Sequence, residues 1–277
     1  MANRVTTRTT RMMMIAGSTF ITALLSAQVA SADRLPDKDI KQLLERIHDE
    51  RDRFEDQLDG KLKHSIIRGE RGEVDVEKYL DDLQENVNKL KDRFTTQYAA
   101  SAEVTTVLRQ ATDIQRYMST LPPNFDGASE WTKLAASLGE LAANYGTTLP
   151  LPDGQQARRM NDGELKKAAE DVAKGADQFK KDLDSSLKMD KTIDVATREA
   201  SVKEADGLKQ DAKKLASAVG DGKPASGEAK ALLDSAARMR TSTSGRPLSP
   251  AAQTAWESVE GGLGKVAFAF GLPAKLP

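Results

Sequence analysis

Residues 131–146 read WTKLAASLGELAANYG, and residues 256–271, near the end of the chain, read WESVEGGLGKVAFAFG. The two stretches are 125 residues apart (256 minus 131), with no insertion between their matching positions. The two tryptophans of the chain, Trp131 and Trp256, therefore occupy equivalent places. Within each stretch the apolar residues recur at steps of three and four, which predicts an amphipathic helix.

The same interval of 125 residues recurs further upstream. Identical residues at this offset include Asp52/Asp177, Phe54/Phe179, Leu58/Leu183, Lys63/Lys188, Leu90/Leu215 and Pro122/Pro247. A heptad pattern alone would not place Trp, Phe, Pro and Gly together at one long offset. The sequence therefore predicts an internal duplication, with one unit in residues 33–150 and a second in 151–277.

The apolar spacing is helical throughout the first unit. Helices are expected at about 37–67, 75–98, 102–118 and 131–145, with Gly and Pro residues between them. No stretch shows the period-2 alternation of a strand. We predict an all-α protein of two tandem antiparallel four-helix bundle units.

The second unit is expected to be the less stable one. Alanines replace larger apolar residues at four of its core positions: Ala168, Ala169, Ala205 and Ala212 stand where the first unit has Leu43, Leu44, Leu80 and Val87. Each buried leucine contributes roughly 1.5–3 kcal/mol, so these changes remove much apolar stabilisation.

The N-terminus predicts export. Arg4, Arg8 and Arg11 precede an apolar run, and Ala30-Ser31-Ala32 forms an Ala-x-Ala site. This pattern is typical of a Sec-type signal peptide covering residues 1–32, cleaved after Ala32. We expect a periplasmic or secreted protein, with no stable membrane span after cleavage.

Charge and composition exclude several classes of function. Without residues 1–32 the chain has 38 basic and 42 acidic side chains, because only three arginines and no acidic residue are lost from totals of 41 and 42. A net charge of −4 gives no basic footprint for nucleic acid. The absence of cysteine excludes disulfides, thiolate metal sites and a thiol nucleophile.

The assembled pattern resembles uncharacterised secreted bacterial helical-repeat proteins. The resemblance is carried by Asp52-Arg53-Phe54, by Leu90-Lys91-Asp92-Arg93-Phe94 and by the spacing in 102–118 and 131–145. In those proteins a unit of this kind occurs once or in tandem behind a signal peptide. The resemblance implies a helical fold and export, and it assigns no activity and no site.

Glu45 and His48 are weak candidates for a metal site, because Glu-x-x-His is the spacing of di-iron bundles. Such a site needs a second Glu-x-x-His, and the sequence holds none, so we expect no metal and no cofactor. The duplicated pairs Asp52/Asp59 and Asp177/Asp184 are seven residues apart, and we expect them to form ion pairs with an adjacent helix.

Several residues have expected structural roles. Phe54, Phe179, Trp131 and Trp256 are expected in the core, although such an aromatic stripe also lines ligand pockets in other proteins. Glycine inside a helix costs about 1 kcal/mol relative to alanine, so we expect close helix crossings at Gly139 and Gly264. Phe268 lies off the apolar stripe and is expected at the junction of the units or at a partner interface.

These features favour a non-catalytic, exported helical protein that acts as a binding or structural module. The alternative is a carrier of a small apolar ligand or cofactor, in a bundle interior or in the cleft between units. We expect no enzymatic activity. The expected partner is a protein of the cell envelope, with association into a homo-oligomer left open.

Overall fold

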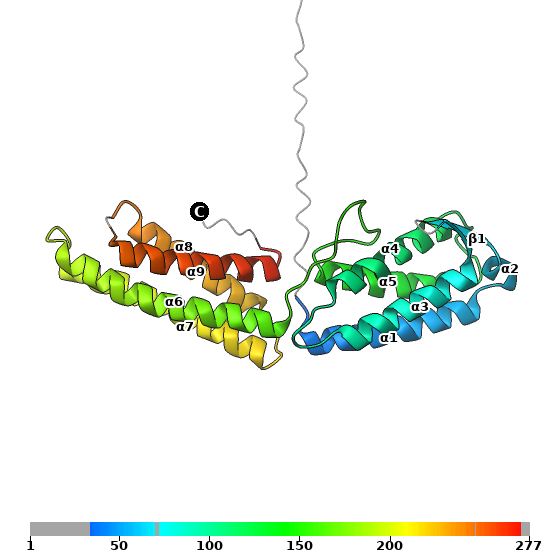
Figure 1. Cartoon of the computed structure of the whole chain (residues 1–277), viewed down its shortest axis with the longest axis horizontal. Coiled ribbons are helices and arrows are strands. Elements are labelled where there is room, and N and C mark those ends of the chain that lie inside the picture. The colour runs from blue at the N-terminus through cyan, green and yellow to red at the C-terminus, as the bar shows by residue number, and fades with distance from the viewer. Residues whose placement is uncertain (1–33, 70–71, 247, 273–277) are drawn as a thin grey trace, which may run out of the picture. The chain divides into compact units, whose positions relative to one another are not determined.

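The structure is a computed structural model, and it describes residues 34–69, 72–246 and 248–272. The predicted signal peptide, residues 1–32, lies outside this part of the chain. The described residues form helices and one two-stranded sheet, so the all-α prediction is confirmed (Figure 1). The helices are α1 (Asp37–Gln57), α2 (Gly60–Lys63), α3 (Val76–Arg93), α4 (Ser101–Met118), α5 (Ala128–Asn144), α6 (Asp162–Met189), α7 (Val195–Gly220), α8 (Ser226–Thr243) and α9 (Pro250–Ala269). Within the described ranges, no helix combines the length and apolar character that crossing a membrane requires.

The long helices surround apolar cores in two sets. We call residues 34–158 the first half and residues 159–272 the second half. In the first half, α1 packs against α3 and α5, and α4 packs against the same two helices. In the second half, α6 packs against α7 and α9, and α8 packs against the same two. Equivalent helices thus have equivalent neighbours, which is compatible with the predicted duplication.

The first half has one continuous core, whereas the core of the second half is divided. Leu80, Leu108 and Leu138 are fully buried in the single cluster of the first half. In the second half, Phe179 and Met239 belong to one cluster, and the alanine-rich remainder forms another. All four alanines that replace larger core residues are at most 3% exposed.

Helix ends follow local chemistry. Asn161 and Glu164 form a reciprocal capping box at the start of α6, so two free amides gain acceptors. At α9, the Ser249 side chain accepts from the Ala252 amide, and Pro250 takes the first helical position. Gly146 (φ 65°) and Gly271 (φ 61°) follow α5 and α9 in the left-handed conformation that often ends a helix.

The predicted helix over 37–67 is wrong in its last third. Helix α1 ends at Gln57, and a hairpin of β1 (Ile66–Gly69) and β2 (Gly72–Asp75) follows the short α2. Ile67 pairs with Val74 and is 1% exposed, so the hairpin adds an apolar side chain to the core. In the second half, α6 instead continues to Met189, and the two halves differ most here.

Candidate functional site

The duplicated aromatic residues form matching pairs in the two halves. The ring centroids of Phe54 and Trp131 are 5.4 Å apart at 50°, and those of Phe179 and Trp256 are 5.1 Å apart at 49°. Both phenylalanines are fully buried, and Trp131 is 8% exposed. Trp256 is half-buried, and its Nε1 donates to Glu260 Oε1 at 2.8 Å. These geometries place all four rings in packing roles.

The close crossings expected at Gly139 and Gly264 are wrong. A Cβ added at either residue would meet no heavy atom within 4 Å, because neither glycine faces a neighbouring helix closely. The close approach lies at Gly262 instead, where an added Cβ would be 2.4 Å from Val172 Cγ2 on α6. Phe268 is 50% exposed on α9, and a partner at this residue stays a prediction.

The weak metal candidates take part in ionic contacts. Lys91 Nζ lies 2.5 Å from Glu45 Oε2, and His48 Nδ1 lies 3.5 Å from Asp52 Oδ2. Through the described part of the chain, no group of three or more metal-ligating side chains is positioned to hold an ion.

The duplicated aspartates differ in their contacts. In the second half both bind basic groups on α7, as expected: Asp177 lies 2.6 Å from Lys209 and Asp184 lies 3.5 Å from Arg198. In the first half, Asp52 contacts Arg51 on its own helix, and Asp59 caps α2 by accepting from the Lys61 amide. Among the described residues, these duplicated aspartates therefore form ion pairs with an adjacent helix in the second half and not in the first.

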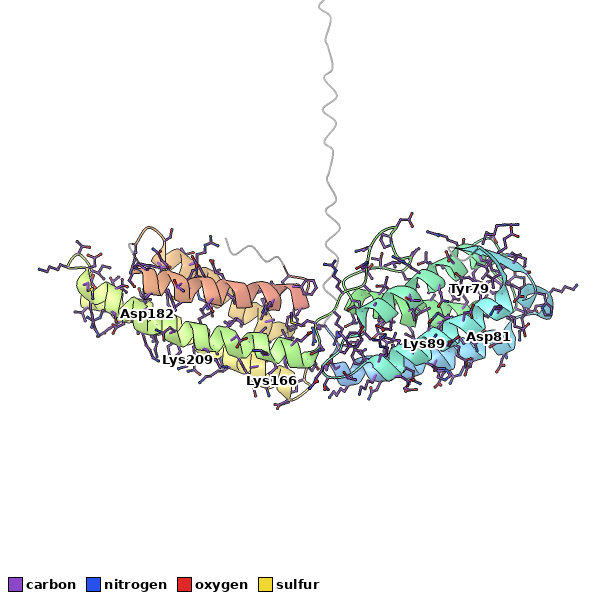
Figure 2. All side chains as sticks on the ribbon, in the orientation of Figure 1. Tyr79, Asp81, Lys89, Lys166, Asp182 and Lys209 are labelled. Carbon is purple, nitrogen blue, oxygen red and sulfur yellow. The ribbon has the colours of Figure 1, made fainter. Side chains whose placement is uncertain are left out.

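An open groove lies between α6 and α7 and has a volume of about 630 Å³. Ala173, Ala216, Ser217 and Gly220 are among its small lining residues. Its charged lining residues are Lys166, Glu170, Lys174, Asp177, Lys209, Lys213 and Asp221. Figure 2 labels Lys166 and Lys209, which lie along these two helices. We call this surface the α6–α7 groove.

Two lining residues of the groove are much smaller than their equivalents in the first half. At the offset of 125 residues, Ala173 corresponds to His48 and Ala216 corresponds to Lys91. In the first half these larger side chains occupy the same face, and Lys91 reaches across to Glu45. In the second half Glu170 takes the place of Glu45, but no lysine stands opposite at position 216. Small residues thus leave the space between the helices open.

At the Asp177 end of the groove, ion pairs hold the charged side chains in place. Hydrogen bonds from Lys181 and Lys209 lower the pKa of Asp177 well below its usual value, so this carboxylate stays charged. Lys209 Nζ is held at 2.6 Å from Asp177 Oδ1. The remaining lysines of the groove give it a small excess of positive charge.

A second cavity, of about 610 Å³, opens beside the start of α4. Its walls include the linker between the halves, and that linker is already bound. The Ala157 amide donates to Thr105 Oγ1 at 3.0 Å, and the Arg159 amide donates to Ser101 Oγ at 3.3 Å. These hydroxyls therefore serve to hold the linker.

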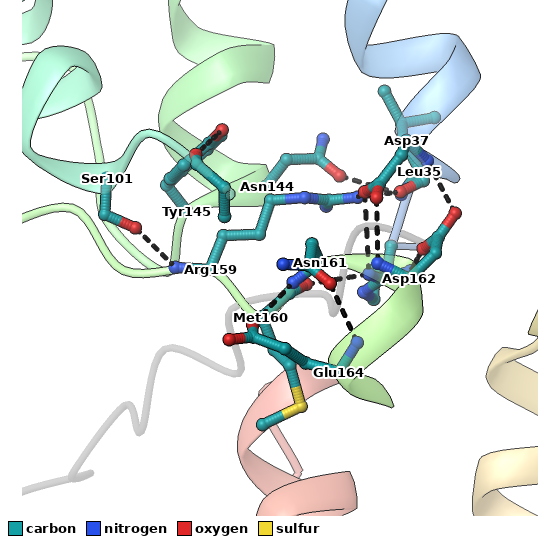
Figure 3. Close-up of polar contacts among 12 residues, drawn as sticks. Leu35, Asp37, Ser101, Asn144, Tyr145, Arg159, Met160, Asn161, Asp162 and Glu164 are labelled. Carbon is teal, nitrogen blue, oxygen red and sulfur yellow. Dashed lines mark hydrogen bonds and ion pairs between the residues drawn. The ribbon is translucent and has the colours of Figure 1, made fainter. Parts of the chain in front are cut away.

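A buried polar cluster at the starts of α1 and α6 is the feature that the apolar pattern did not reveal (Figure 3). Arg34 Nη1 lies 2.6 Å from Asp162 Oδ1, and Arg159 Nη2 lies 2.9 Å from Asp37 Oδ1. All four side chains are largely buried. Burial lowers the pKa of Arg34, and the charge of Arg159 lowers it further, whereas Asp162 and Asp37 oppose the shift. We call these four residues the junction cluster.

A sequence signal for the junction cluster does exist. Arg34/Arg159 and Asp37/Asp162 are identities at the offset of 125 residues, as are Lys41/Lys166 and Glu45/Glu170 near the groove. A charged identity at a helix start differs from the apolar identities that define a core.

Comparison with protein-family models, with curated proteins and with solved structures gives no match.

Proposed function

We propose that the protein is an exported, non-catalytic helical module that binds a helical segment of a cell-envelope protein in the α6–α7 groove. The observation that carries this proposal is the groove itself. Its floor is made of small residues, with Ala173 and Ala216 only 6% and 7% exposed. Small side chains allow the backbone of another helix to approach closely. An amphipathic helix lying in a groove is a common mode of peptide recognition.

The dimensions of the groove suit this partner. It runs from Lys166 to Asp177 on α6, which is about 16 Å at 1.5 Å per residue. This length matches about three turns of a bound helix. Lysines at its edges would pair with carboxylates on the polar face of the partner. Export is supported by the signal-peptide pattern of residues 1–32, and this is the reason for proposing a partner in the envelope.

The test fills the groove with the side chains that fill the first half. The chain from Asp33 onward, bearing an affinity tag, is used to capture proteins from detergent-solubilised envelope. The double variant Ala173→His, Ala216→Lys restores the residues found at positions 48 and 91. It should lose the partner captured by the wild type while its helical circular dichroism and urea unfolding midpoint stay unchanged.

A matched control carries the same two changes elsewhere. Ala251→His with Ala231→Lys introduces the same side chains at exposed helical positions outside the groove, and it should capture the partner as the wild type does. Capture of the same partner by the groove-filled variant would overturn the assignment of the groove.

The carrier alternative predicts a different result. Native mass spectrometry of the purified protein would then show a bound small molecule that the groove-filled variant lacks, and no protein partner would be captured.

Export has its own test. The N-terminal sequence of the protein isolated from whole cells should begin at Asp33. A sequence beginning at Met1 or Ala2 would contradict export by cleavage.

A further inference from the structure

The contacts between the two halves occur in equivalent pairs. Arg34 Nη2 donates to the Met160 carbonyl at 2.8 Å, and Arg159 Nη2 donates to the Leu35 carbonyl at 2.6 Å. Arg159 is the equivalent of Arg34 at the 125-residue offset, and Met160 is the equivalent of Leu35. The two hydrogen bonds therefore join equivalent pairs of residues, with the roles of the two halves exchanged.

The helix starts repeat this exchange. The Asp37 amide donates to Asp162 Oδ2 and the Asp162 amide donates to Asp37 Oδ2, both at 2.8 Å. Each aspartate thus satisfies a free amide at the start of the other helix, where a negative charge is favoured. Figure 3 shows these crossed bonds between α1 and α6.

The ion pairs and the aromatic contacts follow the same rule. Arg34 binds Asp162 and Arg159 binds Asp37, as described for the junction cluster. The guanidinium carbon of Arg34 lies 5.9 Å from the ring centroid of Phe270, and that of Arg159 lies 5.9 Å from that of Tyr145. Tyr145 and Phe270 are again equivalent positions.

Such exchange of equivalents is the defining property of an isologous interface. In a two-fold dimer, residue i of one copy contacts residue j of the other, and j contacts i in turn. Four sets of contacts obey this rule here: crossed helix caps, arginine–carbonyl bonds, arginine–aspartate pairs and arginine–aromatic contacts. Packing that arose only from the linker joining the halves would have no reason to be reciprocal.

We infer that the two halves dock through an internal isologous interface. The docking surface of each half is therefore suited to bind a second copy of the same unit. The surface of the first half consists of residues 34–37 with Tyr145, and that of the second half consists of 159–162 with Phe270. The buried arginine forks fix the register, because each must meet a carbonyl and a carboxylate at once. Neither docking surface shares a residue with the α6–α7 groove.

The test measures docking directly on the full chain. A protease site is placed at Asp153-Gly154, which is exposed in the linker, and the folded protein is cleaved there. The two fragments should remain together as a one-to-one complex. After cleavage, Ala157 stays with the fragment that contains the second half, but it is buried against the rest of the first half. This contact would also hold the fragments together, so the variants below are needed to test the interface.

Equivalent substitutions should both weaken the complex. Asp37→Asn removes the carboxylate that lies 2.9 Å from Arg159 and 3.9 Å from Arg34, and Asp162→Asn removes the one that lies 2.6 Å from Arg34. Each change should raise the dissociation constant of the cleaved complex about tenfold or more. Arg34→Lys and Arg159→Lys form a second matched set, because lysine cannot replace the arginine fork. Asp49→Asn, an exposed change on α1, is the control and should leave the constant unaltered.

Circular dichroism of each uncleaved variant shows that the helices persist. Fragments that separate on cleavage without denaturant would overturn the inference. An isologous interface requires paired effects. The inference would therefore also be overturned if, in each matched set, one variant weakened the complex and the equivalent variant had no effect.

Discussion

Tyr145 and Phe270 occupy equivalent positions at the ends of α5 and α9, but only the tyrosine adds a hydroxyl group. Its Oη donates to the Ala99 carbonyl at 2.6 Å, and the side chain is 1% exposed. Burial raises the pKa of Tyr145 above its ordinary value of 10.0, because the phenolate would lose its hydration. The tyrosine therefore remains neutral in the folded protein at pH values where the unfolded chain ionises.

This shift makes stability depend on pH in the alkaline range. The pKa is higher in the folded state, so the stabilisation is fully present below pH 10 and declines as pH rises above it. At pH 11, one unit above the unfolded pKa, the loss is about 1.4 kcal/mol for this residue. Tyr145→Phe should lower the free energy of unfolding at pH 8, where it removes a buried hydrogen bond, and should reduce the further loss between pH 8 and pH 11.

Urea unfolding at the two pH values measures both effects. Leaving the Ala99 carbonyl without its donor costs about 1–3 kcal/mol at pH 8. Tyr117→Phe, at a partly exposed residue, is the control and should keep the pH dependence of the wild type. An identical pH dependence in wild type and Tyr145→Phe would contradict the shift.

At the scale of elements, the approach of α9 to α6 depends on Gly262. Its added Cβ would lie 2.4 Å from Val172 Cγ2 and 3.5 Å from the Ala168 carbonyl oxygen. A β-branched side chain in a helix has few alternative rotamers, so Val172 cannot move aside easily. Gly175 on α6 makes a similar approach to Val259, with 3.0 Å to its Cγ2. Two glycine–valine contacts therefore bring these helices together.

Two glycines of α9 should respond in opposite directions to the same change. Gly262→Ala should lower the free energy of unfolding by about 1–3 kcal/mol, the usual cost of overpacking. Gly264→Ala should raise it by about 0.5–1 kcal/mol, because the site is open and alanine favours the helix. Thermal unfolding of the two variants tests this prediction, and a destabilised Gly264→Ala would contradict it.

The glycines also show which features of helix packing can be predicted from the sequence. Recurrence identified Gly139 and Gly264 as unusual, but both face open space, whereas the unduplicated Gly262 is at the crossing. Periodicity gives the face that a helix buries, and it does not give the point at which two helices approach most closely. Similarly, the predicted helix over 37–67 includes Ile66 and Ile67, which lie in the first strand of the hairpin. Four-residue strands are too short to show alternation.

At the scale of the whole molecule, the helical class and most helix positions were predictable, because apolar spacing is repeated over many residues. The junction cluster was not predicted. A fixed offset identifies equivalent residues, but contact between Arg34 and Asp162 depends on how the halves dock. The α6–α7 groove was missed for a related reason. Replacement of His48 and Lys91 by alanine is visible in the sequence, and the space that it leaves appears only when both helices are in place.

The two halves should differ in local stability. Leu80 of α3 and Ala205 of α7 are equivalent and fully buried, so the same core position holds a much smaller side chain in the second half. Native-state hydrogen exchange should show faster exchange of buried amides in α7 and α8 than in α3 and α4, because local opening there exposes less apolar surface. Leu80→Ala, which costs about 2–5 kcal/mol, should reduce this difference by weakening the first half.

Ala231→Gly, a change at an exposed position of α8, controls for general effects of substitution. It should increase the difference in exchange rate slightly, because glycine has a lower helix propensity than alanine. Equal exchange rates in the two sets of helices would show that the single leucine-rich core gives the first half no advantage.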